Sequence, residues 1–211
     1  ATYDIVKFEL ETALRLGALP EPLLPLDQMF SMPTFIANYA GGEAAQPFAP
    51  PKDYRNYLSR LDQMVAYIDQ SIANMREGVK RRIVHPREPM QSLLPQLKQL
   101  VAAKADESIF YSPIKRLPAG FSSADKRSLA DAYSKTIGDK LNPALTRLAD
   151  YVEKDYLPKT RSTAGWNALP NGAEWYKARV AAMTTTDMTP EQIHAIGLKE
   201  VARIQGEYGK I

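Results

Sequence analysis

The stretch Asp53–Val79, DYRNYLSRLDQMVAYIDQSIANMREGV, decides the fold class. Its apolar residues recur at alternating steps of four and three: Tyr54, Leu58, Leu61, Val65, Ile68, Ile72, Met75 and Val79. This spacing keeps them on one side of a helix, so it predicts about seven turns with one continuous apolar face. The face needs a partner. We favour other helices of the same chain, packed as an antiparallel bundle; the alternative is a coiled coil between two copies, which would make the protein self-associate.

A second stripe of the same kind follows towards the C-terminal half. Its apolar residues are Leu129, Tyr133, Ile137, Leu141, Leu145, Leu148, Val152 and Tyr156. Ser122 and Asp125 have the spacing of a helix-start signal just before it. Because proline lacks the N–H of a helical hydrogen bond, Pro143 predicts a kink or a break just before that residue.

Shorter patterns predict further helices over Tyr3–Leu16, around Thr34–Tyr39, over Ala173–Met183 and from Pro190 onward. Another helix begins near Pro95 or a turn earlier, with Leu93, Leu94, Leu97, Leu100 and Val101 buried. Residues 18–51 carry seven prolines and predict a long loop lying across the helices. No segment alternates as a strand would. The sequence therefore predicts an all-α fold: residues 1–211 form a single lobe of long antiparallel helices with long Pro-rich loops.

Composition excludes several kinds of function. The net charge is +3, from 27 basic and 24 acidic residues, so no nucleic-acid partner is expected. There is no cysteine, which excludes disulfides and thiolate metal sites. No apolar run is long enough to cross a bilayer, so no transmembrane segment is expected.

The chain carries little catalytic chemistry. Its two histidines are His85 and His194, whereas a catalytic zinc needs about three protein ligands and is marked on helices by H-E-x-x-H, which is missing. No serine-nucleophile or phosphate-loop motif occurs. We therefore expect no catalytic residue, metal ligand or cofactor in this chain. The segment GWNALPNGAEWY, residues 165–176, is either a ligand-facing edge of aromatics and amides or a tight turn anchored by its aromatics, and we favour the turn.

Three ordered motifs lie between residues 156 and 204: Y-L-P-x-x-R, G-x-x-x-L-P-x-G-x-x-x-Y and T-T-x-x-x-T-P-x-x-I-H-x-x-G-x-x-E-V-x-R-I. With them the sequence resembles the bacterial family catalogued as domain of unknown function 885. The resemblance covers nearly the whole chain, since Asp53–Val79 is similar to the family's long helix before these motifs. The segment REGVKRRIVHPRE, residues 76–88, departs from the family by carrying basic residues where a small residue or glycine is more usual.

The resemblance implies a longer, zinc-metallopeptidase-like parent that is exported, periplasmic or anchored at the bacterial envelope and takes peptide substrates. Zinc and the catalytic groups are then expected after Ile211, where the last helix would also find its partners, and this chain supplies one wall of the cleft. Tyr176, His194, Glu200 and Arg203 are the candidates for holding substrate, Arg203 by pairing with a carboxylate. They are otherwise structural links between helices. The alternative function is a non-catalytic helical module of the envelope that binds a peptide or a partner.

Overall fold

The computed structural model describes residues 1–42 and 46–209, so part of the predicted Pro-rich loop, residues 43–45, lies outside the described residues. Within the described ranges the chain is helical without strands, which confirms the all-α class. None of these helices is long and apolar enough to span a membrane. The chain divides into two compact units, Glu21–Thr163 and a second unit made of Ala1–Pro20 and Ala164–Ile211. That residues 1–211 act as one lobe of a larger protein stays a prediction.

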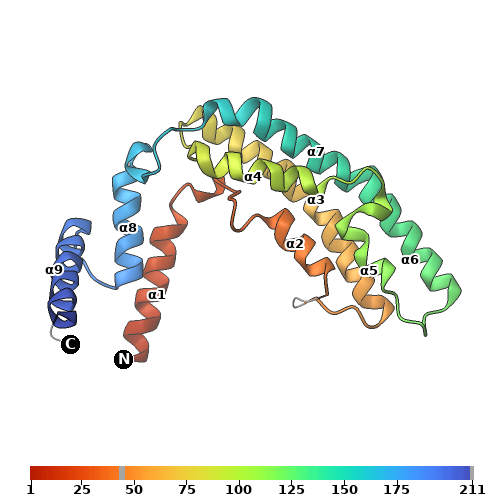
Figure 1. The fold of residues 1–211 in the computed structure, drawn as a ribbon, viewed down its shortest axis with the longest axis horizontal. Coiled ribbons are helices and arrows are strands. Elements are labelled where there is room, and N and C mark those ends of the chain that lie inside the picture. The colour runs from red at the N-terminus through yellow and green to blue at the C-terminus, as the bar shows by residue number, and fades with distance from the viewer. Residues whose placement is uncertain (43–45, 210–211) are drawn as a thin grey trace. The chain divides into compact units, whose positions relative to one another are not determined.

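The larger unit is built around α3, Pro51–Lys80, which packs against α2 (Met32–Ala40), α6 (Ser123–Thr136) and α7 (Asn142–Asp150). Figure 1 shows α3 running alongside α6 and α7. Four of its stripe residues are at most 1% exposed: Tyr54, Leu61, Ile68 and Met75. The stripe of α3 is thus covered by helices of its own chain, as the favoured interpretation expected.

The buried face of α3 is rotated slightly about the helix axis from the predicted face. Tyr57, Met64, Ser71 and Gly78 are buried, whereas Leu58, Val65 and Val79 of the predicted stripe are only partly buried. Gly78 explains the shift at the C-terminal end. A Cβ atom at Gly78 would lie 2.6 Å from the Ile83 carbonyl oxygen and 3.1 Å from that of Leu23, so only glycine permits this close approach of backbone.

The two long helical segments run in the same direction. Tyr133 donates a hydrogen bond to the Tyr54 carbonyl at 2.8 Å, and further along both segments Arg147 pairs with Asp69 at 2.8 Å. Antiparallel packing is found instead between α4 (Arg87–Leu100) and α7, which also contact each other. The reason is that α4 and the segment after it return the chain to the end of the unit where α3 begins.

The second stripe is confirmed as a nearly continuous helix, and all eight of its predicted residues are buried. Ser122 accepts a hydrogen bond from the Asp125 N–H at 3.0 Å, which caps α6 as predicted. Between α6 and α7 the helix widens into a π-helical stretch, Ile137–Leu141, just before Pro143. The widened turn lets the chain pass a residue that has no N–H to donate, so the helix is distorted rather than ended.

The predicted start of α4 was wrong: the helix begins at Arg87, two turns before Pro95. Pro95 lies inside the helix and is exposed to solvent. Water can therefore satisfy the carbonyl that loses its partner there, and the helix tolerates the proline. Leu93, Leu97 and Leu100 are buried as predicted, while Leu94 and Val101 are partly exposed.

Short helical turns complete the larger unit: η1 (Glu21–Leu23), η2 (Ala105–Glu107), η3 (Ile109–Tyr111), α5 (Ser112–Lys115), the π-helical η5 (Tyr151–Tyr156) and η6 (Leu157–Lys159). After α3, Arg82 has φ 60°, and the Ile83 N–H reaches the Gly78 carbonyl at 2.8 Å. This left-handed cap is a position where glycine is usual. The departure noted in residues 76–88 therefore falls on a backbone position that favours glycine.

The smaller unit contains α1 (Thr2–Gly17), η7 (Trp166–Ala168), α8 (Gly172–Thr184) and α9 (Pro190–Tyr208), and α1 packs on α8. A capping box opens α9. The Gln192 N–H donates to the Thr189 hydroxyl at 3.2 Å, and the Thr189 N–H donates to the Gln192 side chain at 2.8 Å. Neither α1 nor α9 has a buried residue.

Candidate functional site

The four residues predicted to hold substrate lie on two helices of the smaller unit. Tyr176 is on α8 with 52% of its surface exposed, and His194, Glu200 and Arg203 are exposed on α9. The structure brings Glu200 and Arg203 together: Arg203 Nε lies 2.8 Å from Glu200 Oε2. A second guanidinium nitrogen of Arg203 lies 2.7 Å from Glu207 Oε1. A substrate carboxylate at Arg203 would have to compete with these two glutamates, although such exposed pairs are weak.

Tyr176 lines a hollow of about 560 Å³ that none of the other three residues lines. Its walls come from the loop before α8, the first turns of α8 and the start of α9. The lining residues are Gly165, Trp166, Asn167, Ala173, Glu174, Tyr176, Lys177, Thr189, Pro190 and Glu191. We call this space the Tyr176 hollow. It combines two aromatic rings with an amide and charges of both signs, the mixture that small-molecule and peptide sites use to fix orientation.

The loop beside this hollow is the tight turn that the sequence favoured. Asn171 has φ 57°, which asparagine tolerates, and Gly172 follows at a position where a Cβ atom would lie 1.6 Å from the Trp166 carbonyl oxygen. The rings of Trp166 and Trp175 meet edge to face with centroids 6.4 Å apart, and both side chains are partly buried. Packing of the two tryptophans fixes the loop and leaves the next aromatic residue, Tyr176, in solvent.

The charge in the Tyr176 hollow is partly set by the start of α9. The pKa of Glu191 is lowered by its own backbone N–H at the helix N-terminus and by a hydrogen bond to Thr189. This carboxylate therefore stays ionised to lower pH than usual. Lys177 provides the opposite charge from α8.

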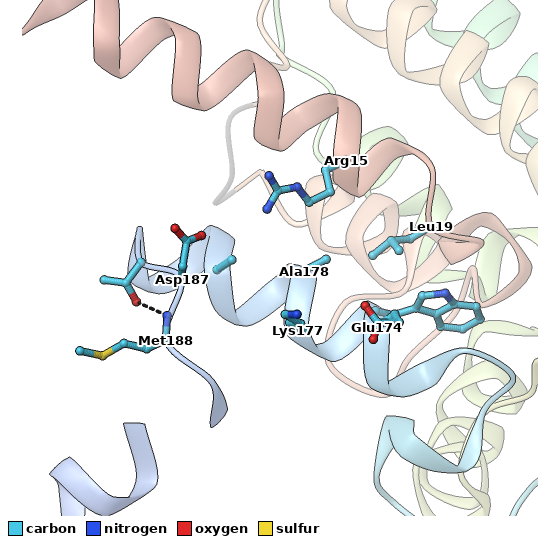
Figure 2. A pocket seen from close by; sticks show the side chains of 10 residues that line it. Arg15, Leu19, Glu174, Lys177, Ala178, Asp187 and Met188 are labelled. Carbon is cyan, nitrogen blue, oxygen red and sulfur yellow. Dashed lines mark hydrogen bonds between the residues drawn. The ribbon is translucent and has the colours of Figure 1, made fainter. Parts of the chain in front are cut away.

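A second hollow, of about 440 Å³, is lined by α8, by the end of α1 and by the turn after α8 (Figure 2). It is lined by Arg15 and Leu19 of α1 and the following turn, by Thr186, Asp187 and Met188 of the turn after α8, and by Glu174, Trp175, Lys177, Ala178 and Ala181 of α8. We call it the Arg15 hollow. Glu174 and Lys177 line both hollows. No sequence pattern indicates this second hollow, because only the packing of α1 on α8 places Arg15 and Asp187 on the same space.

The residues that the structure describes offer no site for the zinc that the family resemblance implies for the longer parent. Among residues 1–42 and 46–209, no group of three or more histidine or carboxylate side chains is arranged to hold a metal. His85 is buried in the larger unit, and burial lowers its pKa to about 4. His194 is exposed on α9. No metal-dependent step is therefore assigned to these residues.

Comparisons with known proteins relate the chain to one family model and to a solved structure. A family model described as "Bacterial protein of unknown function (DUF885)" matches residues 1–211. No curated protein matches the sequence. The crystal structure of "the putative lipoprotein from Colwellia psychrerythraea" is similar to this chain, with a TM-score of 0.72 and 23% sequence identity. The match covers 85% of this chain and 31% of that one, so the chain spans about a third of the length of its structural relative.

Proposed function

The chain belongs to the DUF885 family of bacterial proteins of unknown function, and we propose that it is the N-terminal helical part of a larger zinc-dependent, peptidase-like protein. In this proposal its helices supply one wall of the substrate cleft, and the metal site lies elsewhere in the protein. The observation that carries the proposal is the Tyr176 hollow, which offers aromatic rings, an amide and charges of both signs beside one another.

A peptide would use these groups for binding rather than for bond cleavage. The rings of Trp166 and Tyr176 suit an apolar side chain, and the amide of Asn167 suits a peptide group. Lys177 suits a carboxylate. His194, Glu200 and Arg203 would extend the same wall along α9. An exported or envelope-anchored location belongs to this proposal, supported by the similarity to a protein described as a "putative lipoprotein".

The first test is the mass of the protein in its native cells, measured by immunoblot and intact-mass spectrometry. We expect a species far heavier than the 23.6 kDa of this chain. In that full-length protein, Tyr176→Ala should raise KM for a peptide substrate about tenfold and leave the zinc content unchanged. Tyr3→Ala is the matched control, because Tyr3 is 74% exposed on α1 and lines neither hollow. An equal KM in both variants, or full-length protein without peptide hydrolysis, would contradict the proposal.

The alternative is a non-catalytic helical module that binds a peptide or a partner at the envelope. It is favoured by the apolar residues that α9 leaves in solvent: Ile196, Leu198, Val201 and Ile204 are between 42% and 59% exposed. A species of about 23.6 kDa in cells, together with peptide binding that Trp166→Ala abolishes and no hydrolysis, would support this module over the peptidase-like parent.

A further inference from the structure

We infer that the Arg15 hollow binds a small zwitterion, a molecule that carries both a carboxylate and an ammonium group, such as a short peptide or an amino acid. Four charged side chains line this hollow, two of each sign: Arg15, Lys177, Glu174 and Asp187. Figure 2 shows Arg15 reaching from α1 into the space that Asp187 borders, with Glu174 and Lys177 along α8. This site shares Glu174 and Lys177 with the Tyr176 hollow, but Arg15 and Asp187 line the Arg15 hollow alone, so the inference does not depend on the function proposed for the Tyr176 hollow.

None of the four side chains forms an ion pair or a side-chain hydrogen bond with another described residue, although opposite charges border the same hollow. Elsewhere in the smaller unit, charged groups do pair at contact distance, as Arg203 does with Glu200 and Glu207. Charges of both signs that face one space without meeting leave room for a ligand that bridges them. A ligand that carries charge of one sign only would be repelled by two of these side chains, whereas a zwitterion can be attracted by the two positive and the two negative side chains.

The hollow also has an apolar surface and a suitable size. Leu19, Trp175, Ala178, Ala181 and Met188 contribute the apolar part of its lining. Its volume of about 440 Å³ lies in the range of roughly 300–1,000 Å³ that small-molecule sites occupy. An aliphatic or aromatic side chain of an amino acid or peptide would therefore be covered there, while its charged groups reach the rim.

The position of Asp187 is set by the turn at the end of α8. Thr185 has φ 56°, a left-handed conformation that a β-branched residue adopts only at a cost of about 1–2 kcal/mol. The hydroxyls on either side of it hold the turn: Thr184 Oγ1 donates to the Val180 carbonyl at 2.8 Å and lies 3.1 Å from Thr186 Oγ1. The Thr185 N–H donates to the Ala181 carbonyl at 2.9 Å, so this residue forms the left-handed C-cap that ends α8. The turn that follows this cap places Asp187 at the rim of the hollow.

Each charged group has a distinct part in this site. The planar guanidinium of Arg15 can hold a carboxylate through two parallel hydrogen bonds, which a lysine cannot do. Asp187 and Glu174 would accept hydrogen bonds from the ammonium group. Lys177 adds a second positive charge near the carboxylate.

The test is isothermal titration of the whole chain with the dipeptide Leu-Leu, with L-leucine, and with Leu-Leu blocked at both ends by acetyl and amide groups. We expect one of the free zwitterions to bind, and which of them binds more tightly identifies a peptide or an amino acid as the natural class. The blocked dipeptide should bind at least tenfold more weakly. Equal binding of free and blocked dipeptide, or no binding of either zwitterion, would overturn the inference.

Matched variants locate the binding. Arg15→Gln should weaken the affinity at least tenfold and Arg15→Lys by a smaller factor, since lysine keeps the charge and loses the fork. Asp187→Asn should weaken it severalfold. The controls are Arg55→Gln on α3 and Asp131→Asn on α6, two exposed charges that line neither hollow. If Arg15→Gln behaves like Arg55→Gln while circular dichroism shows both to be folded, the Arg15 hollow is not the site.

Discussion

The helices α3 and α9 both carry several large apolar residues and differ in what covers them. In α3, Tyr54, Leu61, Ile68 and Met75 are at most 1% exposed, because α2, α6 and α7 pack on them. In α9, all apolar residues remain at least partly in solvent, and no residue of the helix is buried. The apolar face of a helix therefore stabilises the fold only when another part of the protein covers it. The four predictions below test this difference, from the largest expected effect to the smallest.

The largest contrast is between two leucines truncated in the same way. Leu61→Ala in α3 should lower the free energy of unfolding by about 2–5 kcal/mol, since Leu61 is fully buried and its loss leaves a cavity. Leu198→Ala in α9 should change it by less than about 0.5 kcal/mol, since Leu198 is 59% exposed. Urea unfolding followed by circular dichroism measures both. A large effect of Leu198→Ala would mean that α9 is covered in solution.

The second prediction concerns His85, a buried titratable group of the larger unit. Burial lowers its pKa from 6.5 to about 4; the negative charge of Asp27 opposes this shift and the positive charge of Arg161 adds to it. Below pH 6.5 the unfolded chain binds a proton at this histidine while the folded chain does not. Stability at this site should therefore fall as the pH drops from 6.5 towards 4, by on the order of 3 kcal/mol.

The measurement is the free energy of unfolding at several pH values between 4 and 7, for the natural chain and for His85→Gln. The variant should lose this part of the pH dependence, whatever its absolute stability. His194→Gln is the matched control, because His194 is exposed on α9. If both variants keep the same slope as the natural chain, His85 is not held neutral by the fold.

The sequence predicted the larger unit well because its elements depend on local signals. Periodicity located both long helices, and the Ser122 cap and the distortion before Pro143 followed from the chemistry of single residues. These local signals did not predict the relative direction of the two long helical segments. That direction depends on α4 and the segment after it, which bring the chain back to the start of α3, and no local pattern encodes such a return.

The candidate sites were less accessible to sequence reasoning. Tyr176 was selected through the family resemblance and does line a hollow, but its role in binding stays a prediction. Arg15 was not selected at all. Its place in one hollow with Asp187 arises from the contact of α1 with α8, two helices separated by the entire larger unit in the sequence. A site formed by residues so far apart leaves no spacing to recognise.

The third prediction makes one substitution at two helical glycines. Gly78→Ala in α3 should destabilise the fold by about 1–3 kcal/mol, because its Cβ would lie 2.6 Å from the Ile83 carbonyl oxygen. Gly197→Ala in α9 should instead stabilise it by about 0.5–1 kcal/mol, because nothing lies within 4 Å of that position and alanine favours the helix. Thermal unfolding measures whether each substitution stabilises or destabilises the fold. A destabilising Gly197→Ala would reveal a neighbour packed closely on α9.

The smallest effect is expected where both units place an unfavourable residue in the left-handed region. Arg82 in the cap of α3 has φ 60°, and Thr185 after α8 has φ 56°. Glycine adopts this conformation without steric cost, so Arg82→Gly and Thr185→Gly should each raise the free energy of unfolding by about 0.5–1 kcal/mol. Because Thr185 is β-branched, Thr185→Gly should raise the free energy of unfolding more than Arg82→Gly does. If the backbone conformation of Thr185 helps to form the Arg15 hollow, Thr185→Gly should also weaken binding of a zwitterion severalfold. Arg82→Gly should leave that binding unchanged. A more stable Thr185→Gly variant with full affinity would show that this conformation does not contribute to binding.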